Sequence, residues 1–304
     1  MDIKDIESQK KVFINYTDNF INENDESKIN GYIDKQNHSL FVLDEAMLTD
    51  ALFTKYNESF KNLLALESLF HDIGRFRQLK ETGSFKDNEL KDYYPNMEDH
   101  GDLGKAVMQE SNFLKELIPG VRIYDEEIEK VIGAHAKVNP ELLNSILKEY
   151  IEAFRNYDLS ELFKSDKASK EREVLFATNT SIIQDVDRLD IFRKIVKGIW
   201  VPMSTTDKID ENVMELFKQG KLPRMIDLKN AGLWNANVGH LVRLSFINQM
   251  NLVPVLMKVR NENLIDKVFE KTGNDIVAPA YEQAKKMLDE AINSSDDGIL
   301  VKKR

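Results

Sequence analysis

Apolar residues recur every three to four positions along most of the chain, and this spacing constrains the fold more than any other feature. In residues 59–70, SFKNLLALESLF, the apolar side chains fall on one stripe of a helix. A helix with such a stripe buries it against its neighbours. Similar patterns cover residues 126–136, 142–154, 173–201, 241–269 and 276–292. We find no alternating run of apolar residues bounded by turn residues, so the sequence predicts an all-α fold.

Glycine and proline residues mark most of the breaks between these predicted helices. The stretch from Gly83 to Asp102 is polar and contains Pro95, and residues 165–171 form a second polar stretch. Both are predicted to be loops, and long loops inside a compact domain are often functional. No low-complexity linker divides the chain. We therefore expect a domain of residues 1–200 and a C-terminal helical extension, residues 201–304, that packs on it or continues it.

The composition limits the chemistry and the partners. The 304 residues include no cysteine, which excludes disulfides and thiolate metal sites. The net charge is −10 and no basic stripe is visible, so long nucleic acid is not an expected partner. A few local cations suffice to hold a small phosphorylated molecule. With no secretory signal and no apolar run of about 18 residues, we expect a cytoplasmic protein that does not span a membrane.

Histidines are few, and four of the five are spread over the first half of the chain: His38, His71, His100 and His135. Imidazole is the commonest metal ligand near neutral pH, and carboxylates complete such sites. His71 is followed directly by Asp72 at the end of an apolar helix, and Gly74 is predicted to stop that helix. A carboxylate at a helix end can lie between two metal ions.

A second acidic segment, IIQDVDRLD at residues 182–190, lies inside an apolar helical pattern. Asp187 shares a helix face with Ile183 and Ile191, so its side chain is predicted to point inward. A buried carboxylate needs a cation or a hydrogen-bond partner, and a metal ion satisfies this requirement. Asp185 is the competing candidate, because it lies two residues away and faces elsewhere.

The order His, His-Asp, Asp, with the pair in HDIGR and the last aspartate in DVDRLD, resembles the HD superfamily of metal-dependent phosphohydrolases. The histidines in EDHGDLG and IGAHAK resemble the six-ligand, two-metal subset of that superfamily. The resemblance implies an HD-domain helical bundle with additional C-terminal helices. It implies two divalent metal ions, manganese, iron or another, on six ligands: His38, His71, Asp72, His100, His135 and Asp187. Asp72 would bridge the two ions.

The resemblance also suggests which residues contact the substrate. Arg75 follows the His-Asp pair and Lys137 follows His135, so both are predicted to hold a substrate phosphate and, with Asp72, to take part in catalysis. Ordinary ion pairs are the competing interpretation for both cations. The residues predicted to bind substrate are Arg75, Gln78, Thr82, Asp87 and Lys137. The fifth histidine, His240, has no partner motif and is expected to be structural or to lie on the surface.

These residues predict hydrolysis of a phosphate mono- or diester, in a nucleotide or another small phosphorylated metabolite, by a metal-activated water. The ligand order also resembles that of mixed-valent di-iron oxygenases in the same superfamily. Histidine and carboxylate ligands suit iron as well as manganese, so the oxygenase stays an alternative. A non-catalytic ligand-binding module with the same fold is the third interpretation. The sequence leaves the oligomeric state open.

Overall fold

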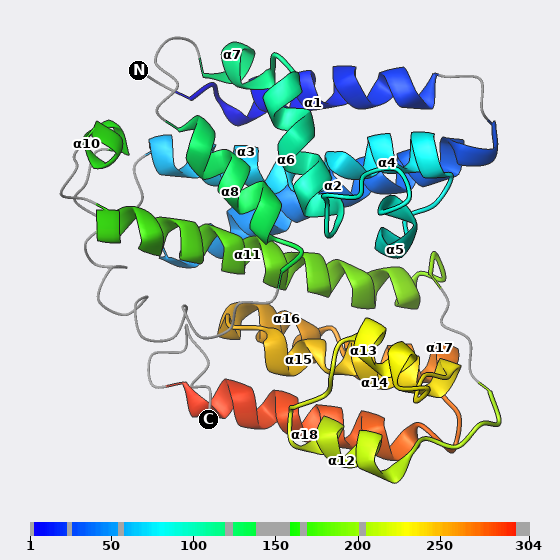
Figure 1. The fold of residues 1–304 in the computed structure, drawn as a ribbon. Helices are drawn as coiled ribbons and strands as arrows, with labels where there is room; N and C mark the ends of the chain where they lie inside the picture. Colours follow the sequence, from blue (N-terminus) through cyan, green and yellow to red (C-terminus); the bar gives the residue numbers. More distant parts are fainter. Residues whose placement is uncertain are drawn as a thin grey trace. The chain divides into compact units, whose positions relative to one another are not determined.

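The computed structural model describes residues 3–22, 26–53, 58–118, 124–137, 159–164, 169–200 and 205–295. Within these ranges the regular structure is helical and no β-strand is formed, which confirms the predicted all-α class (Figure 1). By its contacts the chain divides into two compact units, residues 1–186 and 187–304. No helix within the described ranges combines the length and the apolar character needed to cross a membrane.

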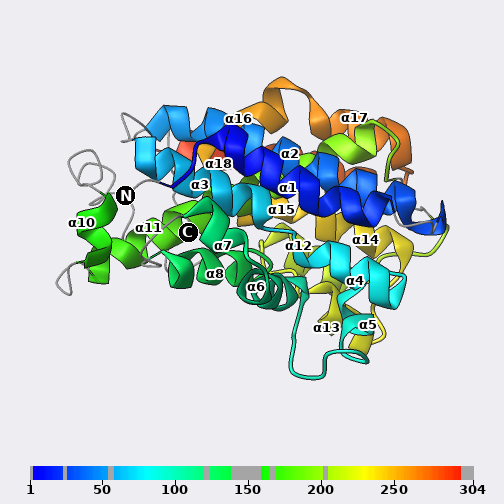
Figure 2. The same cartoon turned by 90° about the horizontal axis from the view of Figure 1, so that it is seen from above.

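The first unit is a bundle of helices. In it α2 (Glu26–Phe53) packs on α1 (Ile6–Ile21) and α3 (Glu58–Phe70). Helix α6 (His100–Glu110) packs on both α4 (Gly74–Thr82) and α8 (Asp125–Ala134). Helix α6 lies at a steep angle to α1. It runs up the page in Figure 1, where α1 runs across it, and is seen end-on in Figure 2. Helix α11 (Ser169–Val196) begins in the first unit and ends in the second. The remaining described helices of the first unit are α5 (Asp87–Leu90), α7 (Phe113–Leu117) and α10 (Leu159–Lys164).

Glycines allow α4, α6 and α8 to approach one another at backbone distance. A Cβ atom on Gly74 would lie 2.5 Å from the backbone nitrogen of Gly104 and 2.6 Å from the backbone oxygen of His100. A Cβ atom on Gly101 would lie 2.9 Å from the backbone oxygen of Gly133. No side chain fits at such distances, so only glycine permits these contacts. The ends of the three helices are thereby drawn together.

The prediction that Gly74 stops a helix is wrong. Helix α3 ends at Phe70, residues 71–73 form a turn, and Gly74 is the first residue of α4. The positive φ typical of a helix stop occurs at Gly83, which ends α4 with φ 71°. Gly74 is needed for the contact with α6 and not for its backbone conformation.

The second unit is built around α18, which contacts α12 and each helix from α14 to α17. The predicted helical run of residues 241–269 is broken into several helices. Pro254, which has no N–H group, lies in the first turn of α16, and Asn263 has a φ of 53° between α16 and α17. The helices of this unit are α12 (Glu211–Lys218), α13 (Met225–Asn230), α14 (Ala236–Leu244), α15 (Phe246–Gln249), α16 (Val253–Asn261), α17 (Leu264–Thr272) and α18 (Ala278–Ser294).

The remaining predicted helices agree with the structure where it describes them, whereas the two predicted loops agree only in part. The patterns at 126–136, 173–201 and 276–292 correspond to α8, α11 and α18. The pattern at 142–154 lies outside the described residues. The polar stretch 83–102 is a loop apart from α5 and the start of α6. In the second polar stretch, residues 165–168 lie outside the described residues, and 169–171 begin α11.

Candidate metal centre

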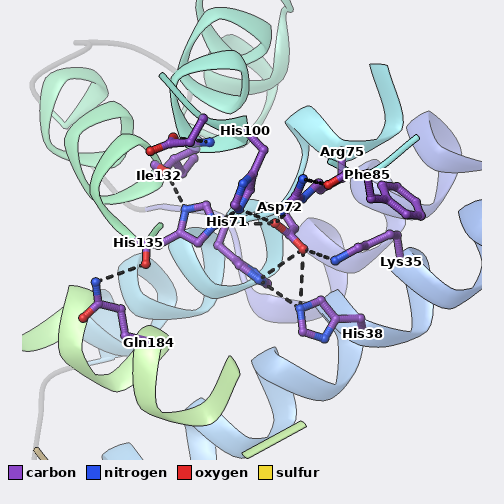
Figure 3. A network of polar contacts seen from close by, with 12 residues as sticks. Lys35, His38, His71, Asp72, Arg75, Phe85, His100, Ile132, His135 and Gln184 are labelled. Atoms are coloured by element: carbon purple, nitrogen blue, oxygen red, sulfur yellow. Dashed lines mark hydrogen bonds and ion pairs between the residues drawn. The ribbon is translucent and has the colours of Figure 1, made fainter. Parts of the chain in front are cut away.

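Five of the six predicted metal ligands come together in the first unit, and Figure 3 shows their side chains converging. Most lie where a helix begins or ends. His38 lies within α2, His71 and Asp72 in the turn after α3, His100 at the start of α6, and His135 directly after α8. Their side chains are almost completely buried, and that of His100 keeps the largest exposed fraction, 12%.

The carboxylate of Asp72 lies between two pairs of imidazole rings. Its Oδ2 atom is 3.5 Å from His38 Nε2 and 3.9 Å from His71 Nε2. Its Oδ1 atom is 3.3 Å from His100 Nε2 and 3.5 Å from His135 Nε2. Two sets of three ligands result, and within each set the ligand atoms lie within 4.8 Å of one another. The cluster can therefore hold a metal ion, and Asp72 belongs to both sets.

Backbone carbonyl groups behind the rings determine which ring nitrogen faces the cluster. His71 Nδ1 lies 2.7 Å from the backbone oxygen of Ser68, and His135 Nδ1 lies 2.6 Å from that of Ile132. A carbonyl oxygen only accepts, so Nδ1 carries the proton in both rings. A neutral ring held in this way presents the lone pair of Nε2 to the cluster, as a metal ligand must.

The ring nitrogens face one another at short distances. His100 Nε2 is 3.0 Å from His135 Nε2, and His38 Nε2 is 3.3 Å from His71 Nε2. In the first pair, the Nδ1 atoms of both rings face oxygen acceptors, so two Nε2 lone pairs would point at each other. Such an arrangement is repulsive unless a cation lies between or beside them. The donor set of imidazole nitrogens and a carboxylate therefore fits a divalent metal ion.

Lys35 is a residue of this centre that the sequence did not reveal. Its Nζ atom is 2.7 Å from Asp72 Oδ2, and it precedes His38 by one turn of α2. Burial alone would raise the pKa of Asp72, but the ammonium group of Lys35 beside it helps to lower the pKa well below its usual value. The carboxylate is therefore ionised. Lysine is not a typical metal ligand, so a search for ligand patterns passes over it, and its spacing from His38 was the only available signal.

Arg75 is held against the loop that follows α4. Its Nη1 group donates to Gln78 Oε1, to the backbone oxygen of Phe85 and to Asp87 Oδ1, each at 2.7 Å. Asp87 also lies 3.1 Å from His100 Nδ1. Burial opposes ionisation of Asp87, but His100 and Arg75 lower its pKa to about 2. The ionised Asp87 thus accepts from His100 and orients its Nε2 towards the cluster.

The other residues predicted to bind substrate lie farther along the same elements. Thr82 Oγ1 lies 2.9 Å from the backbone oxygen of Gln78, at the end of α4. Lys137 follows α8 and forms an ion pair of 2.8 Å with Asp102, and 43% of its side chain is exposed. The substrate-binding roles of Arg75, Gln78, Thr82, Asp87 and Lys137 stay predictions.

Helix caps fix the segments that carry two of the ligands. Asp99 accepts from the backbone N–H groups of Gly101 and Asp102, so α6 begins at His100. At the end of α8, the amide of Gln184 donates to the backbone oxygens of His135, at 3.1 Å, and Lys137, at 2.6 Å. These bonds satisfy carbonyl groups that a helix end leaves without partners.

Asp187, the sixth predicted ligand, is the first residue of the second unit. It is partly buried, whereas Asp185 is fully buried. Its role as a metal ligand stays a prediction. His240, also in the second unit, is buried with its Nδ1 2.9 Å from the hydroxyl of Tyr281, which agrees with the structural role expected for it.

Comparisons with protein-family models, curated proteins and solved structures found no match to this chain. The buried histidine–aspartate cluster is nevertheless compatible with a metal site of the HD type.

Proposed function

We propose that the chain is a cytoplasmic phosphohydrolase that uses two divalent metal ions to cleave a phosphate mono- or diester of a nucleotide or another small phosphorylated metabolite. The observation that supports this proposal is the placement of Asp72, whose two carboxylate oxygens face different pairs of imidazoles. A shared carboxylate suits a pair of metal ions that act on one phosphate group.

Bound metal ions would supply a water molecule with a pKa near neutrality and positive charge for the phosphate oxygens. The chain's own residues prepare the site for that chemistry. Asp72 stays ionised, and the backbone contacts of His71 and His135 keep their Nε2 lone pairs turned inward.

Two cations lie close enough to the centre to hold a substrate phosphate. Lys35 Nζ lies 2.7 Å from Asp72, and Arg75 Nε lies 3.8 Å from it. Charged N–H donors positioned beside the reacting group stabilise the charge that builds up on phosphate oxygens. Lys137, which is partly exposed, adds a third positive charge on the α8 side. We therefore assign substrate binding first to Lys35 and Arg75.

The test is to measure the metal content of the full chain purified without chelator, and then its activity with added manganese. Nucleotides and sugar phosphates are screened for phosphate release, and phosphodiesters for their products by chromatography. We expect two metal ions per chain together with hydrolysis, and both should be lost in Asp72→Asn. The matched control is Asp92→Asn, an exposed aspartate beside α5.

The same experiment separates the alternatives. Bound iron with substrate-dependent oxygen uptake and no phosphate release would favour the oxygenase. Metal binding and specific binding of a phosphorylated ligand, without turnover, would favour the non-catalytic module. A metal-free and inactive protein would contradict both the metal centre and the proposed activity.

A further inference from the structure

Arg243, in the last turn of α14, has donor groups that its own surroundings leave unused. Its Nε and Nη1 atoms are buried, and neither has a hydrogen-bond partner within the described part of the chain. An arginine keeps its positive charge at neutral pH even though burial lowers the pKa of Arg243. Buried N–H groups of a charged side chain are costly to leave without an acceptor.

Another arginine of the second unit shows the usual arrangement. Arg193 donates from Nε to Glu262 Oε2 at 2.7 Å, so a carboxylate faces its guanidinium group. The guanidinium group of Arg243 lies against the Trp200 ring instead. Arg243 therefore differs from Arg193 in that its Nε group has no acceptor within the described residues.

Of the two tryptophans of the chain, Trp200 lies against Arg243, and Trp234 lies beside the same glycine, Gly239, as Arg243 does. Arg243 Cζ is 4.7 Å from the centre of the Trp200 ring. A Cβ atom on Gly239 would lie 3.2 Å from Arg243 Nη1 and 3.5 Å from the Trp234 ring, so both groups rest over the bare backbone of Gly239. An aromatic face holds a guanidinium group in place without occupying its N–H donors. The arrangement therefore fixes Arg243 and leaves its Nε and Nη1 groups without an acceptor.

We propose that Arg243 forms an oxyanion-binding site that takes the phosphate or carboxylate group of a small ligand, with Trp200 as one wall. Trp200 is 44% exposed, so a movement of this ring into solvent would uncover the buried Nε and Nη1 groups for a ligand. The residues of the site, Trp200, Trp234, Gly239 and Arg243, all belong to the second unit, whereas the five clustered metal ligands belong to the first. The proposal does not depend on the phosphohydrolase activity.

The tryptophans provide a direct readout of binding. Inorganic phosphate and, separately, acetate are titrated into the full metal-free chain at constant ionic strength, and the intrinsic tryptophan fluorescence is recorded. We expect a saturable change with at least one of the two anions. Arg243→Gln should weaken that binding at least tenfold.

Two controls isolate the site. Arg224→Gln removes an exposed arginine of the same unit, which is paired with Asp227, and should leave binding unchanged. His71→Ala changes the metal centre and should also leave it unchanged, which separates this site from the proposed active site.

Saturation by phosphate alone assigns the site to phosphate groups, and saturation by acetate alone assigns it to carboxylates. The proposal is overturned if neither anion saturates, or if Arg243→Gln binds as tightly as the wild type. If Arg243→Gln does not fold, as judged by circular dichroism, Arg243→Lys takes its place. Lysine keeps the charge but lacks the planar set of donors, so binding should again weaken tenfold, and unchanged binding would overturn the proposal.

Discussion

Asp87 accepts from His100 Nδ1 and from Arg75, and so holds one predicted metal ligand in position. Asp87→Asn keeps the size of the side chain but removes its charge. Because such outer contacts orient the ligand and raise its basicity, we expect metal affinity to fall by about 10–100-fold. Competition with a metal-binding dye measures this loss. Asp92→Asn serves as the control, and wild-type affinity in Asp87→Asn would mean that other contacts orient His100.

Asp187 is the predicted ligand whose role the cluster leaves open. If it binds metal, Asp187→Asn should lower the metal content per chain, measured by mass spectrometry of the purified protein. Asp185→Asn, two residues away in the same helix, should keep the wild-type metal content. The reverse result would assign the ligand to Asp185, and no change in either variant would limit the centre to the five clustered residues.

At the scale of single residues, the sequence predicted those residues whose side chains are typical metal ligands. His38, His71 and Asp72 were identified because imidazoles and a neighbouring carboxylate are metal ligands, and the structure brings them together. Lys35 was missed because a lysine near the middle of a helix is normally a surface residue. The contact of Asp87 with His100 depends on how a loop folds back, which no local pattern encodes.

At the scale of helices, the contact between α4 and α6 depends on the absence of a side chain at Gly74. Gly74→Ala would place a Cβ atom 2.5 Å from the backbone of Gly104. Backbone atoms cannot move aside as a flexible side chain can, so we expect the free energy of unfolding to fall by about 1–3 kcal/mol. Urea denaturation measures it, and metal binding should weaken as well, because His71 and Asp72 lie in the turn before Gly74.

Gly133→Ala is the matched control for that substitution. Among the described residues its Cβ atom would meet only the Lys105 side chain, at 3.9 Å, and alanine is the better helix former within α8. We expect its stability to be unchanged or higher by up to about 1 kcal/mol. An equal loss in both variants would show that the contact with α6 is not what requires glycine at position 74.

Two buried carboxyl groups, Glu67 in α3 and Glu127 in α8, make the bundle sensitive to pH. Burial raises the pKa of Glu127 to about 7, and burial together with Glu127 raises that of Glu67 well above its usual value. A raised pKa stabilises the folded state when the group is protonated. This contribution is complete below the unfolded pKa, near 4.5, and is lost as the pH rises through the folded pKa.

We therefore expect the free energy of unfolding to fall between about pH 4.5 and 7, by about 3 kcal/mol for Glu127 alone. Glu127→Gln cannot ionise and should make this part of the pH profile flatter in urea denaturation. Glu116→Gln, at an exposed position of α7, should keep the wild-type slope. A profile that Glu127→Gln leaves unchanged would contradict the assigned pKa shift.

Helix boundaries were predictable where apolar spacing and breakers agreed, as for α3, α8 and α18. They were not predictable in residues 241–269, because the apolar spacing continues through the interruptions at Pro254 and Asn263. The close contacts of Gly74 and Gly101 were also out of reach, since a contact between helices is a property of their packing. Local sequence patterns thus described the helices better than their contacts.

At the scale of the whole molecule, the clustered ligands come from segments that only folding brings together. An unfolded chain offers no such arrangement, so metal should bind mainly to the folded state and stabilise it. With free manganese at 100 times its dissociation constant, we expect about 2.7 kcal/mol of added stability for each ion bound. Thermal denaturation with manganese and with chelator measures the shift, and Asp72→Asn should show none. A shift of wild-type size in that variant would place the bound metal elsewhere.

The position of Asp72 between the two imidazole pairs also limits how such a protein can evolve. Each histidine serves one pair, so a mutation of one histidine weakens one half of the centre first. A mutation of Asp72 removes a donor from both halves in a single step. A descendant lineage can therefore drift gradually to a different metal preference through its histidines. Once it loses this aspartate, it is expected to keep the helical scaffold and abandon metal chemistry altogether.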